Sequence, residues 1–239
     1  MKPIFATQTL QVPPKQFFMS LQDIRFWIHS AQTDAELARL QKVHSVQQAF
    51  DMLYEKDADP WGYLVPRYRY QRLKYAKMLG MIPAREYDSV LDVGCGIGVF
   101  ARMVAPYARE VLGVELSATA VRRARELSSN HPNVRFEQGS LLDMQGTTEN
   151  QHDIVILADV LYYLATLSDE DLKSVVALAS SLVKPGGILL VANHFFFDLD
   201  PQSRMIRRIH QAFQWTPSLT LLQEQRHPFF LASVLQKSV

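Results

Sequence analysis

The amino-acid sequence predicts an α/β fold in which a mostly parallel sheet ends in an antiparallel hairpin. After about residue 85, short aliphatic and β-branched runs alternate with helical stretches. This alternation is typical of parallel strands covered by helices on both faces. Near the end, the strand-like runs Ser218–Gln225 and Pro228–Gln236 are separated only by Arg226-His227. So short a link can only join antiparallel strands.

The first part of the chain predicts helices. Residues 1–15 hold three prolines and have little periodicity, so they are expected to form an irregular arm. From Pro14 to Met52 the pattern is helical, with apolar residues at three- and four-residue spacings in Phe17, Phe18, Leu21, Ile24 and Ile28. Thr33, with Glu36 three residues later, is expected to cap a second helical run.

A turn and a third helix complete this part. Asp59-Pro60-Trp61-Gly62 predicts a break, because proline disfavours helix at the residue before it and glycine permits a turn. Tyr68 to Leu79 is helical again, and Gly80 suits a left-handed cap. We therefore expect an arm and helical cap over residues 1–80 and an α/β domain over residues 81–239.

The α/β part is interpreted element by element. The five strands expected before the hairpin are Ser89–Val93, Val111–Glu115, Val134–Glu137, Asp153–Leu157 and Gly187–Ala192. The helices expected between them are Gly98–Pro106, Ala118–Ser129, Asp159–Ala165 and Ser168–Leu182. With the hairpin, the sheet has seven strands.

Composition excludes several classes of protein. The 25 basic and 24 acidic residues nearly balance, so nothing indicates the basic surface that a nucleic-acid partner requires. One cysteine, Cys95, excludes an intramolecular disulfide. No apolar run approaches the roughly 20 residues of a membrane span, and the N-terminus lacks the apolar stretch of a signal peptide. We expect a cytoplasmic protein without a membrane partner.

A glycine-rich turn follows the first expected strand. In Val90-Leu91-Asp92-Val93-Gly94-Cys95-Gly96-Ile97-Gly98, three glycines permit a sharp strand-to-helix turn and close approach of a ligand to the backbone. An acid at Asp92 suits a positively charged cofactor and would repel a pyrophosphate. The last glycine also comes one residue too early for the nicotinamide dinucleotide pattern.

The second expected strand supports the interpretation of this turn as a cofactor-binding site. It ends in Glu115, 17 residues after Gly98, where a carboxylate can accept hydrogen bonds from both ribose hydroxyls. The alternatives are a tight turn that binds no ligand and a nicotinamide-dependent oxidoreductase.

These residues resemble a known family. The glycine turn, Glu115, the acid after the fourth strand and Lys184-Pro185-Gly186-Gly187 are similar to class I S-adenosylmethionine-dependent methyltransferases, which have a Rossmann-like fold. A narrower resemblance, to the nodulation protein S type and its small-molecule relatives, rests on four further segments: Phe50-Asp51 through Tyr54, Asp59-Pro60-Trp61-Gly62-Tyr63, Tyr70-Gln71-Arg72-Leu73-Lys74-Tyr75 and Leu161-Tyr162-Tyr163-Leu164. The resemblance implies that the Asp-Pro-Trp segment closes over the cofactor.

The resemblance also implies roles for individual residues. Gly94, Cys95 and Gly96 would contact the methionine part of S-adenosylmethionine, Glu115 the ribose and Leu116 the adenine face. Further cofactor contacts would come from Arg72, at the carboxylate, and from Asp92, Gly98, Ser140, Leu141 and Ala158. The sequence departs from many relatives at Ser140, where they carry aspartate, and at Gln71, where an acid is usual.

Catalytic candidates follow the fourth and fifth strands. His194 would take a proton from the acceptor, and Asp159 would bind the cofactor or orient the acceptor. Trp61, Tyr63, Tyr162, Tyr163 and Phe195 are expected to line the acceptor pocket, although each is equally consistent with packing. A cluster at Arg204, Arg207 and Arg208 is expected to be a solvated helix face.

These expectations combine into one functional hypothesis. The sequence predicts metal-free methyl transfer from S-adenosylmethionine to a nitrogen or oxygen of a small molecule, such as an amine, an amino sugar or a specialised metabolite, with S-adenosylhomocysteine as product. A cyclase or rearrangement enzyme on the same fold is the alternative, because cofactor motifs report binding and not turnover. A homodimer is possible through the N-terminal extension.

Overall fold

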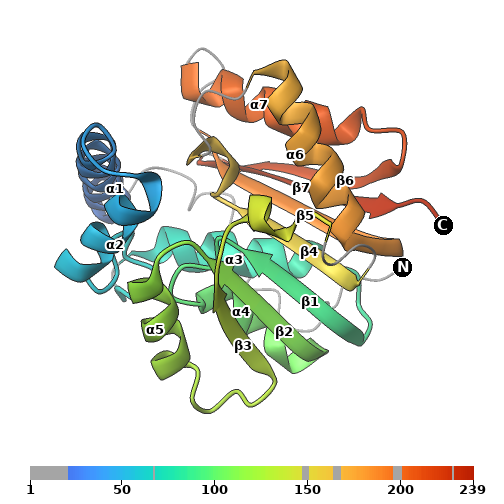
Figure 1. Ribbon diagram of the computed structural model, residues 1–239, viewed down its shortest axis with the longest axis horizontal. Coiled ribbons are helices and arrows are strands. Elements are labelled where there is room, and N and C mark those ends of the chain that lie inside the picture. Colours follow the sequence, from blue (N-terminus) through green and yellow to red (C-terminus); the bar gives the residue numbers. More distant parts are fainter. Residues whose placement is uncertain (1–20, 67, 147–150, 164–167, 196–200, 228) are drawn as a thin grey trace.

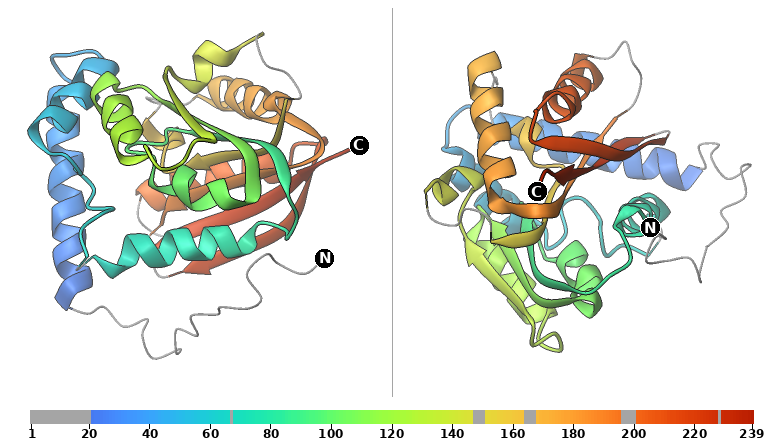
Figure 2. Two further views of the ribbon diagram at one scale, coloured as in Figure 1. Left: turned by 90° about the horizontal axis from the view of Figure 1, so that it is seen from below. Right: turned by 90° about the vertical axis from the view of Figure 1, so that its right-hand side faces the viewer.

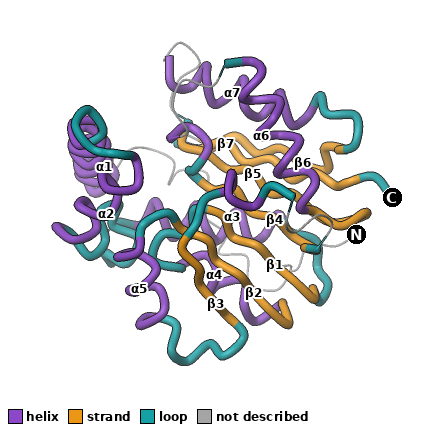
Figure 3. Tube along the Cα trace, viewed as in Figure 1, coloured by secondary structure: helices purple, strands orange, loops and turns teal. Residues whose placement is uncertain are grey.

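The computed structural model describes residues 21–66, 68–146, 151–163, 168–195, 201–227 and 229–239. One seven-stranded sheet runs through the molecule in the order β3-β2-β1-β4-β5-β7-β6 (Figures 1 and 3). The strands are β1 Tyr87–Val93, β2 Ala108–Glu115, β3 Val134–Gln138, β4 His152–Ala158, β5 Val183–His194, β6 Leu219–His227 and β7 Phe230–Lys237. The first five are parallel, and β7 is antiparallel to both of its neighbours, which confirms the predicted fold.

Both faces of the sheet are buried, because aliphatic residues occupy successive positions of the central strands. In β4, Ile154 and Ile156 face one core, and Val155 and Leu157 face the other. The first core lies under α3 Arg69–Met81, α4 Val99–Val104 and α5 Ala118–Leu127. The second lies under α6 Asp169–Leu182 and α7 Pro201–Gln214, and the right-hand view of Figure 2 shows the two layers.

The topology places a binding crevice at a defined edge. The chain leaves β1 toward β2 and β3, then crosses back to β4 on the other side of β1. In parallel α/β sheets, ligands bind outside the carboxyl ends of the strands at such a reversal. The turns after β1, β2, β4 and β5 therefore meet there.

Two N-terminal helices cover this edge. Helix α1 spans Leu21–Leu40 and α2 spans Val46–Lys56, and both lie at one end of the sheet in Figures 1 and 2. Leu37, Phe50 and Trp61 form a third hydrophobic cluster with Ile97 of the glycine turn. The cap, defined here as α1, α2 and the turn at residues 59–62, is thus packed directly on the turn after β1.

Polar contacts attach α2 to α5. One carboxylate oxygen of Asp51 accepts a hydrogen bond from the Ser117 hydroxyl at 2.6 Å, and the Arg123 guanidinium donates to the Asp57 carbonyl at 2.8 Å. Ser117 is itself the N-cap of α5. The start of α5 and the second cap helix are therefore held as one unit.

Several sequence predictions about local structure are wrong. Thr33 does not cap a helix: it lies inside α1, and its hydroxyl donates to the Pro60 carbonyl at 2.8 Å, a partner that comes from the tertiary fold. Gly80 does not end α3, which continues to Met81 with Gly80 outside the left-handed region. Residues 159–163 form only a short 3₁₀ turn at Leu161–Tyr163, because Asp159 adopts a left-handed φ of 55°. The arm at residues 1–15, Phe17 and Phe18 lie outside the described residues.

No helix in the described ranges is long and apolar enough to cross a membrane.

The helical Gly80 predicts a stabilising substitution. A Cβ added there would meet no atom within 4 Å, and helical glycine is less favourable than alanine by about 0.5–1 kcal/mol. Gly80→Ala should therefore raise the free energy of unfolding in urea by roughly that amount. The matched control is Gly98→Ala: φ there is 72°, and a Cβ would lie 2.4 Å from Phe136, so this variant should be destabilised. A loss of stability in Gly80→Ala would contradict the prediction.

Candidate active site

A cavity lies between the cap and the carboxyl ends of the strands. It encloses about 1200 Å³ of empty space, part of it open to solvent. Its walls come from the glycine turn after β1, the ends of β2, β4 and β5, helix α3 and the cap. Because its lining includes both the glycine turn and residues of the cap, the two ends of the cavity belong to one continuous space.

The glycine turn forms the floor of one half of the cavity. Gly94 and Gly96 have φ values of 68° and 54°, in the left-handed region that favours glycine. A Cβ on Gly94 would lie 2.5 Å from Val160, and one on Gly96 would lie 2.9 Å from the Tyr54 hydroxyl. Only glycine leaves the backbone open to a ligand here.

Glu115 stands beside this turn at the end of β2. Its carboxylate oxygens accept hydrogen bonds from the backbone N–H groups of Gly96 and Ser117, each at 3.0 Å. These bonds orient the carboxylate, and burial raises the pKa of Glu115. Each carboxylate oxygen can accept more than one hydrogen bond, so the group remains suited to the two hydroxyls of a ribose.

An ion pair lies on the side of the glycine turn that is opposite Glu115. Lys74 of α3 is 1% exposed and forms an ion pair with Asp159, whose second oxygen accepts from the His194 backbone N–H at 2.8 Å. Nearby, the buried Gln71 side chain lines the cavity, and its carbonyl oxygen has no hydrogen-bond partner among the residues described. A cation, an anion and a free acceptor are the groups that would bind the carboxylate and ammonium of an amino acid.

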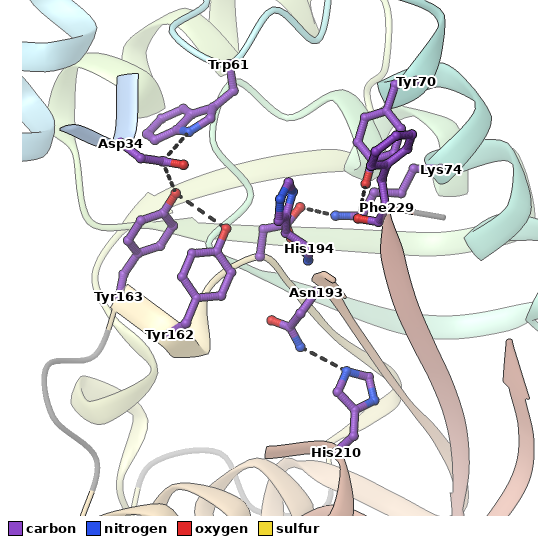
Figure 4. A network of polar contacts seen from close by, with 11 residues as sticks. Asp34, Trp61, Tyr70, Lys74, Tyr162, Tyr163, Asn193, His194, His210 and Phe229 are labelled. Carbon is purple, nitrogen blue, oxygen red and sulfur yellow. Dashed lines mark hydrogen bonds and ion pairs between the residues drawn. The ribbon is translucent and has the colours of Figure 1, made fainter. Parts of the chain in front are cut away.

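A polar network faces the other half of the cavity (Figure 4). One oxygen of Asp34, on α1, accepts from the Trp61 indole N–H at 3.2 Å and from the Tyr163 hydroxyl at 3.1 Å. The Tyr162 hydroxyl donates to that of Tyr163 at 3.4 Å. Burial raises the pKa of Asp34 and holds both tyrosine pKa values well above their ordinary range.

Most of the predicted site residues line this one cavity. Those from the α/β domain are Gly94, Cys95, Gly96, Glu115, Leu116, Ser140, Leu141, Ala158, Asp159, Tyr162, Tyr163 and His194. Trp61 and Tyr63 join them from the cap side. Burial raises the pKa of Cys95 well above its usual value, so the thiol stays protonated. The contacts predicted between these residues and a cofactor or acceptor stay predictions.

Four predicted residues do not line the cavity. Arg72 is exposed on α3, because Gln71 and Lys74 occupy the helix face toward the cavity. Asp92 is buried beneath the turn, and Gly98 packs against Phe136 where α4 begins. Phe195 is fully buried in the second core, with its ring 5.3 Å from the Arg207 guanidinium and 4.9 Å from that of Arg226. The structure thus places these four residues outside the lining of the cavity, and their contacts with a ligand stay predictions.

Several lining residues were not predicted from the sequence. They come from the cap and α3: Phe50, Tyr54, Asp34, Tyr70, Gln71 and Lys74. In the sequence, Asp34 stands among the charged residues of an amphipathic helix, which normally face solvent. Lys74 has one signal in the sequence: it stands three residues after Gln71, and positions three apart lie on the same face of a helix.

The sequence of this chain is similar to those of known methyltransferases. Residues 90–187 match the family described as "Methyltransferase domain". "Nodulation protein S" of Bradyrhizobium diazoefficiens is 32% identical over 108 residues, which cover 44% of this chain and 49% of that protein. "Ubiquinone biosynthesis O-methyltransferase" of Albidiferax ferrireducens is 33% identical over 102 residues, covering 42% of this chain and 38% of the other. The chain thus spans about half the length of such relatives, or less.

Solved structures share the fold. The N-methyltransferase NodS from Bradyrhizobium japonicum, in complex with S-adenosylhomocysteine, aligns with a TM-score of 0.62 at 16% identity. The alignment covers 87% of this chain and 98% of that one. Residues 90–187 thus match a methyltransferase domain, and the fold and the glycine turn are similar to those of class I S-adenosylmethionine-dependent methyltransferases. Within that class, the chain resembles nodulation protein S.

The cavity fits the cofactor of this class, S-adenosylmethionine. Glu115 would hold the ribose, and the backbone of Gly94 and Gly96 would face the methionine part. Lys74 and Gln71, with its unpaired oxygen, would bind the amino-acid end. Lys74, which lines the cavity, is therefore better placed than the exposed Arg72 to face the carboxylate of the cofactor.

This reassignment predicts different effects for two neighbouring substitutions. Lys74→Gln should weaken binding of S-adenosylhomocysteine roughly 10- to 100-fold, because a hydrogen bond to a charged group contributes about 1.5–3 kcal/mol. Arg72→Gln removes the same charge from an exposed position of the same helix and should leave the Kd unchanged. Isothermal titration calorimetry measures both constants. The reverse order of effects would return the carboxylate to Arg72.

The buried Asp92 predicts a pH-dependent stability. One oxygen accepts from the Ala101 backbone and the other has no partner in the described part of the chain. Burial, assisted by Glu115, raises the pKa of Asp92 from 3.8 to about 7. Between these values the folded state binds the extra proton, so the carboxyl's contribution to the free energy of unfolding falls as the pH rises.

Asp92→Asn removes this contribution. The stability of the variant relative to wild type should therefore increase from about pH 4 to about pH 7 and then level off, as measured by urea unfolding at each pH. Asp88→Asn, at an exposed position of the same strand, is the control and should show no such trend. A flat difference for Asp92→Asn would contradict the predicted ionisation.

Proposed function

We propose that the protein transfers the methyl group of S-adenosylmethionine to a nitrogen or oxygen of a small molecule bound beneath the cap. The single observation that carries this proposal is the continuity of the cavity. The cofactor turn and the network around Asp34 line one space, with Ala158, Asp159 and His194 between the strand ends. In this proposal the cap covers both ligands, and α3 contributes Gln71 and Lys74 to the cofactor side of the cavity.

In the proposed methyl transfer, the main role of the protein is to position the two reactants. S-adenosylmethionine supplies a cationic methyl group, whose bond to sulfur breaks as the bond to the acceptor forms, leaving S-adenosylhomocysteine. Lys74, Gln71 and Glu115 fix the donor, and the cap aromatic residues exclude water and confine the acceptor. Holding two reactants in line accounts for most of the acceleration in such a displacement.

An acceptor that carries a proton must also lose it. His194, at the end of β5, lines the cavity, and its imidazole is our candidate to take that proton. Asp159 is assigned a positioning role, because Lys74 and the His194 backbone already engage both of its oxygens.

The names of the relatives support both types of acceptor atom. One similar structure is an N-methyltransferase, and one similar curated protein is an O-methyltransferase. The test is to incubate the protein with S-adenosylmethionine and panels of amines and phenols, and to measure S-adenosylhomocysteine and product mass. We expect a product heavier by one methylene unit together with equimolar S-adenosylhomocysteine.

Other outcomes identify the alternatives. A product of unchanged mass, with no cofactor consumed, would favour a cyclase or rearrangement enzyme. Thermal stabilisation by a nicotinamide dinucleotide alone would overturn the proposal.

His194→Ala tests the assignment of the base. Loss of a general base slows proton transfer by about 10²- to 10⁴-fold, so kcat should fall within that range. The affinity for S-adenosylhomocysteine should stay unchanged, because the side chain is assigned to the acceptor and not to the cofactor. Wild-type kcat in the variant would eliminate His194 as the base.

A further inference from the structure

The carboxylate of Asp34 differs in its partners from the other two acids of the cavity. Asp159 is paired with the Lys74 ammonium, and Glu115 accepts two backbone N–H groups next to the cofactor turn. Asp34 accepts only from the neutral donors Trp61 and Tyr163. Across the described ranges, no lysine, arginine or histidine contacts it.

This arrangement leaves the half-buried carboxylate of Asp34 without a cation at the aromatic wall of the cavity. Partial burial raises the pKa of Asp34, because loss of water contact disfavours the charged form. Removing a carboxylate from water without a cation is costly, and a ligand that brings the cation recovers that cost on binding. An anionic ligand would increase the repulsion.

The walls around Asp34 favour a cation as well. Phe50, Tyr54, Trp61 and Tyr163 all line the cavity and pack together, with ring centroids 5.4–6.2 Å apart in the pairs that touch. Aromatic faces attract ammonium groups within about 6 Å. The indole N–H and the phenol hydroxyl are already turned to the carboxylate, as Figure 4 shows, so they hold it in place.

We propose that Asp34 is a specificity-determining residue that binds a protonated amine of the acceptor, so that the protein selects cationic acceptors over neutral alcohols, phenols and carboxylates. The inference rests on the proposed function, because it assigns the acceptor half of the same cavity. It adds the charge of the acceptor and the side chain that recognises it.

The experiment uses the full chain saturated with S-adenosylhomocysteine. Three probes share a phenyl ring and a short chain but differ in charge: phenethylamine, phenethyl alcohol and phenylacetate. Thermal stabilisation and calorimetric titration are measured for each. We expect the amine to bind at least tenfold more tightly than the alcohol, and phenylacetate to be the weakest of the three.

Asp34→Asn is the decisive variant. The amide keeps an oxygen that can accept from Trp61 and Tyr163 but loses the charge, so the fold and the affinity for S-adenosylhomocysteine should be retained. The preference for amine over alcohol should fall about tenfold or more, in line with a charge-assisted hydrogen bond.

The matched control is Glu36→Gln on the same helix. The Glu36 carboxylate pairs with Arg39 and Lys56 at the surface and does not line the cavity, so its loss removes the same charge at a distance from the site. This variant should keep the full preference for the amine.

The results separate the two proposals. If S-adenosylhomocysteine fails to bind the wild type, the proposed function fails. If it binds but the wild type shows no preference for the amine, or no response to any probe, the role of Asp34 is overturned alone. An unchanged amine preference in Asp34→Asn would overturn it as well.

Discussion

The contacts of Asp159 hold the active-site edge together. Its carboxylate joins Lys74 of α3 to the backbone of His194 at the end of β5, and its own N–H donates to the Ala192 carbonyl at 2.8 Å. A buried ion pair is stable only when its remaining hydrogen-bonding capacity is satisfied, and both carboxylate oxygens are engaged here. The left-handed φ of 55° allows this geometry, and it also starts the short turn that carries Tyr162 and Tyr163.

The cap is attached to the same edge of the sheet. Tyr163 reaches Asp34 on α1, and Trp61 donates to the same carboxylate, so the β4 turn and the cap meet at one side chain. On the opposite side, Asp51 and Arg123 fasten α2 to α5. The Tyr54 hydroxyl of α2 lies close to Gly96, 2.9 Å from the place that a Cβ would occupy. A change in the glycine turn therefore directly affects α2 of the cap.

The two halves of the cavity have different polar residues. Lys74, Gln71 and Glu115 surround the turn and match the polar ends of the cofactor. Asp34 faces the aromatic half without a cation from the described chain. Under the proposed function, this division would let one space bind a donor and an acceptor of different chemistry, since each half presents a separate set of partners.

The sequence by itself determined the sheet and the cofactor turn. The aliphatic runs of the strands, the short hairpin link and the glycines before α4 are local signals, because they depend on backbone conformation and on the burial of successive residues. The position of the link was wrong, because Arg226 and His227 belong to β6 and pair with β7. Glu115 was found for the same reason, since the end of β2 lies beside the end of β1 in any such sheet. Gly94, Gly96 and Glu115 all line the cavity as expected.

Only the tertiary structure decided which cap residues enter the site. Asp34, 125 positions before Asp159 in the chain, shares the cavity with it because α1 folds over the sheet edge. The predictions for Thr33 and Gly80 were wrong because a local helix signal contains no information about a tertiary partner such as the Pro60 carbonyl. It also does not say whether a helix continues past a glycine. Likewise, Arg72 and Lys74 are both cations of α3, and the choice between them depends on how α3 rotates against the core. Such rotations are set by packing against distant residues, which one sequence does not reveal.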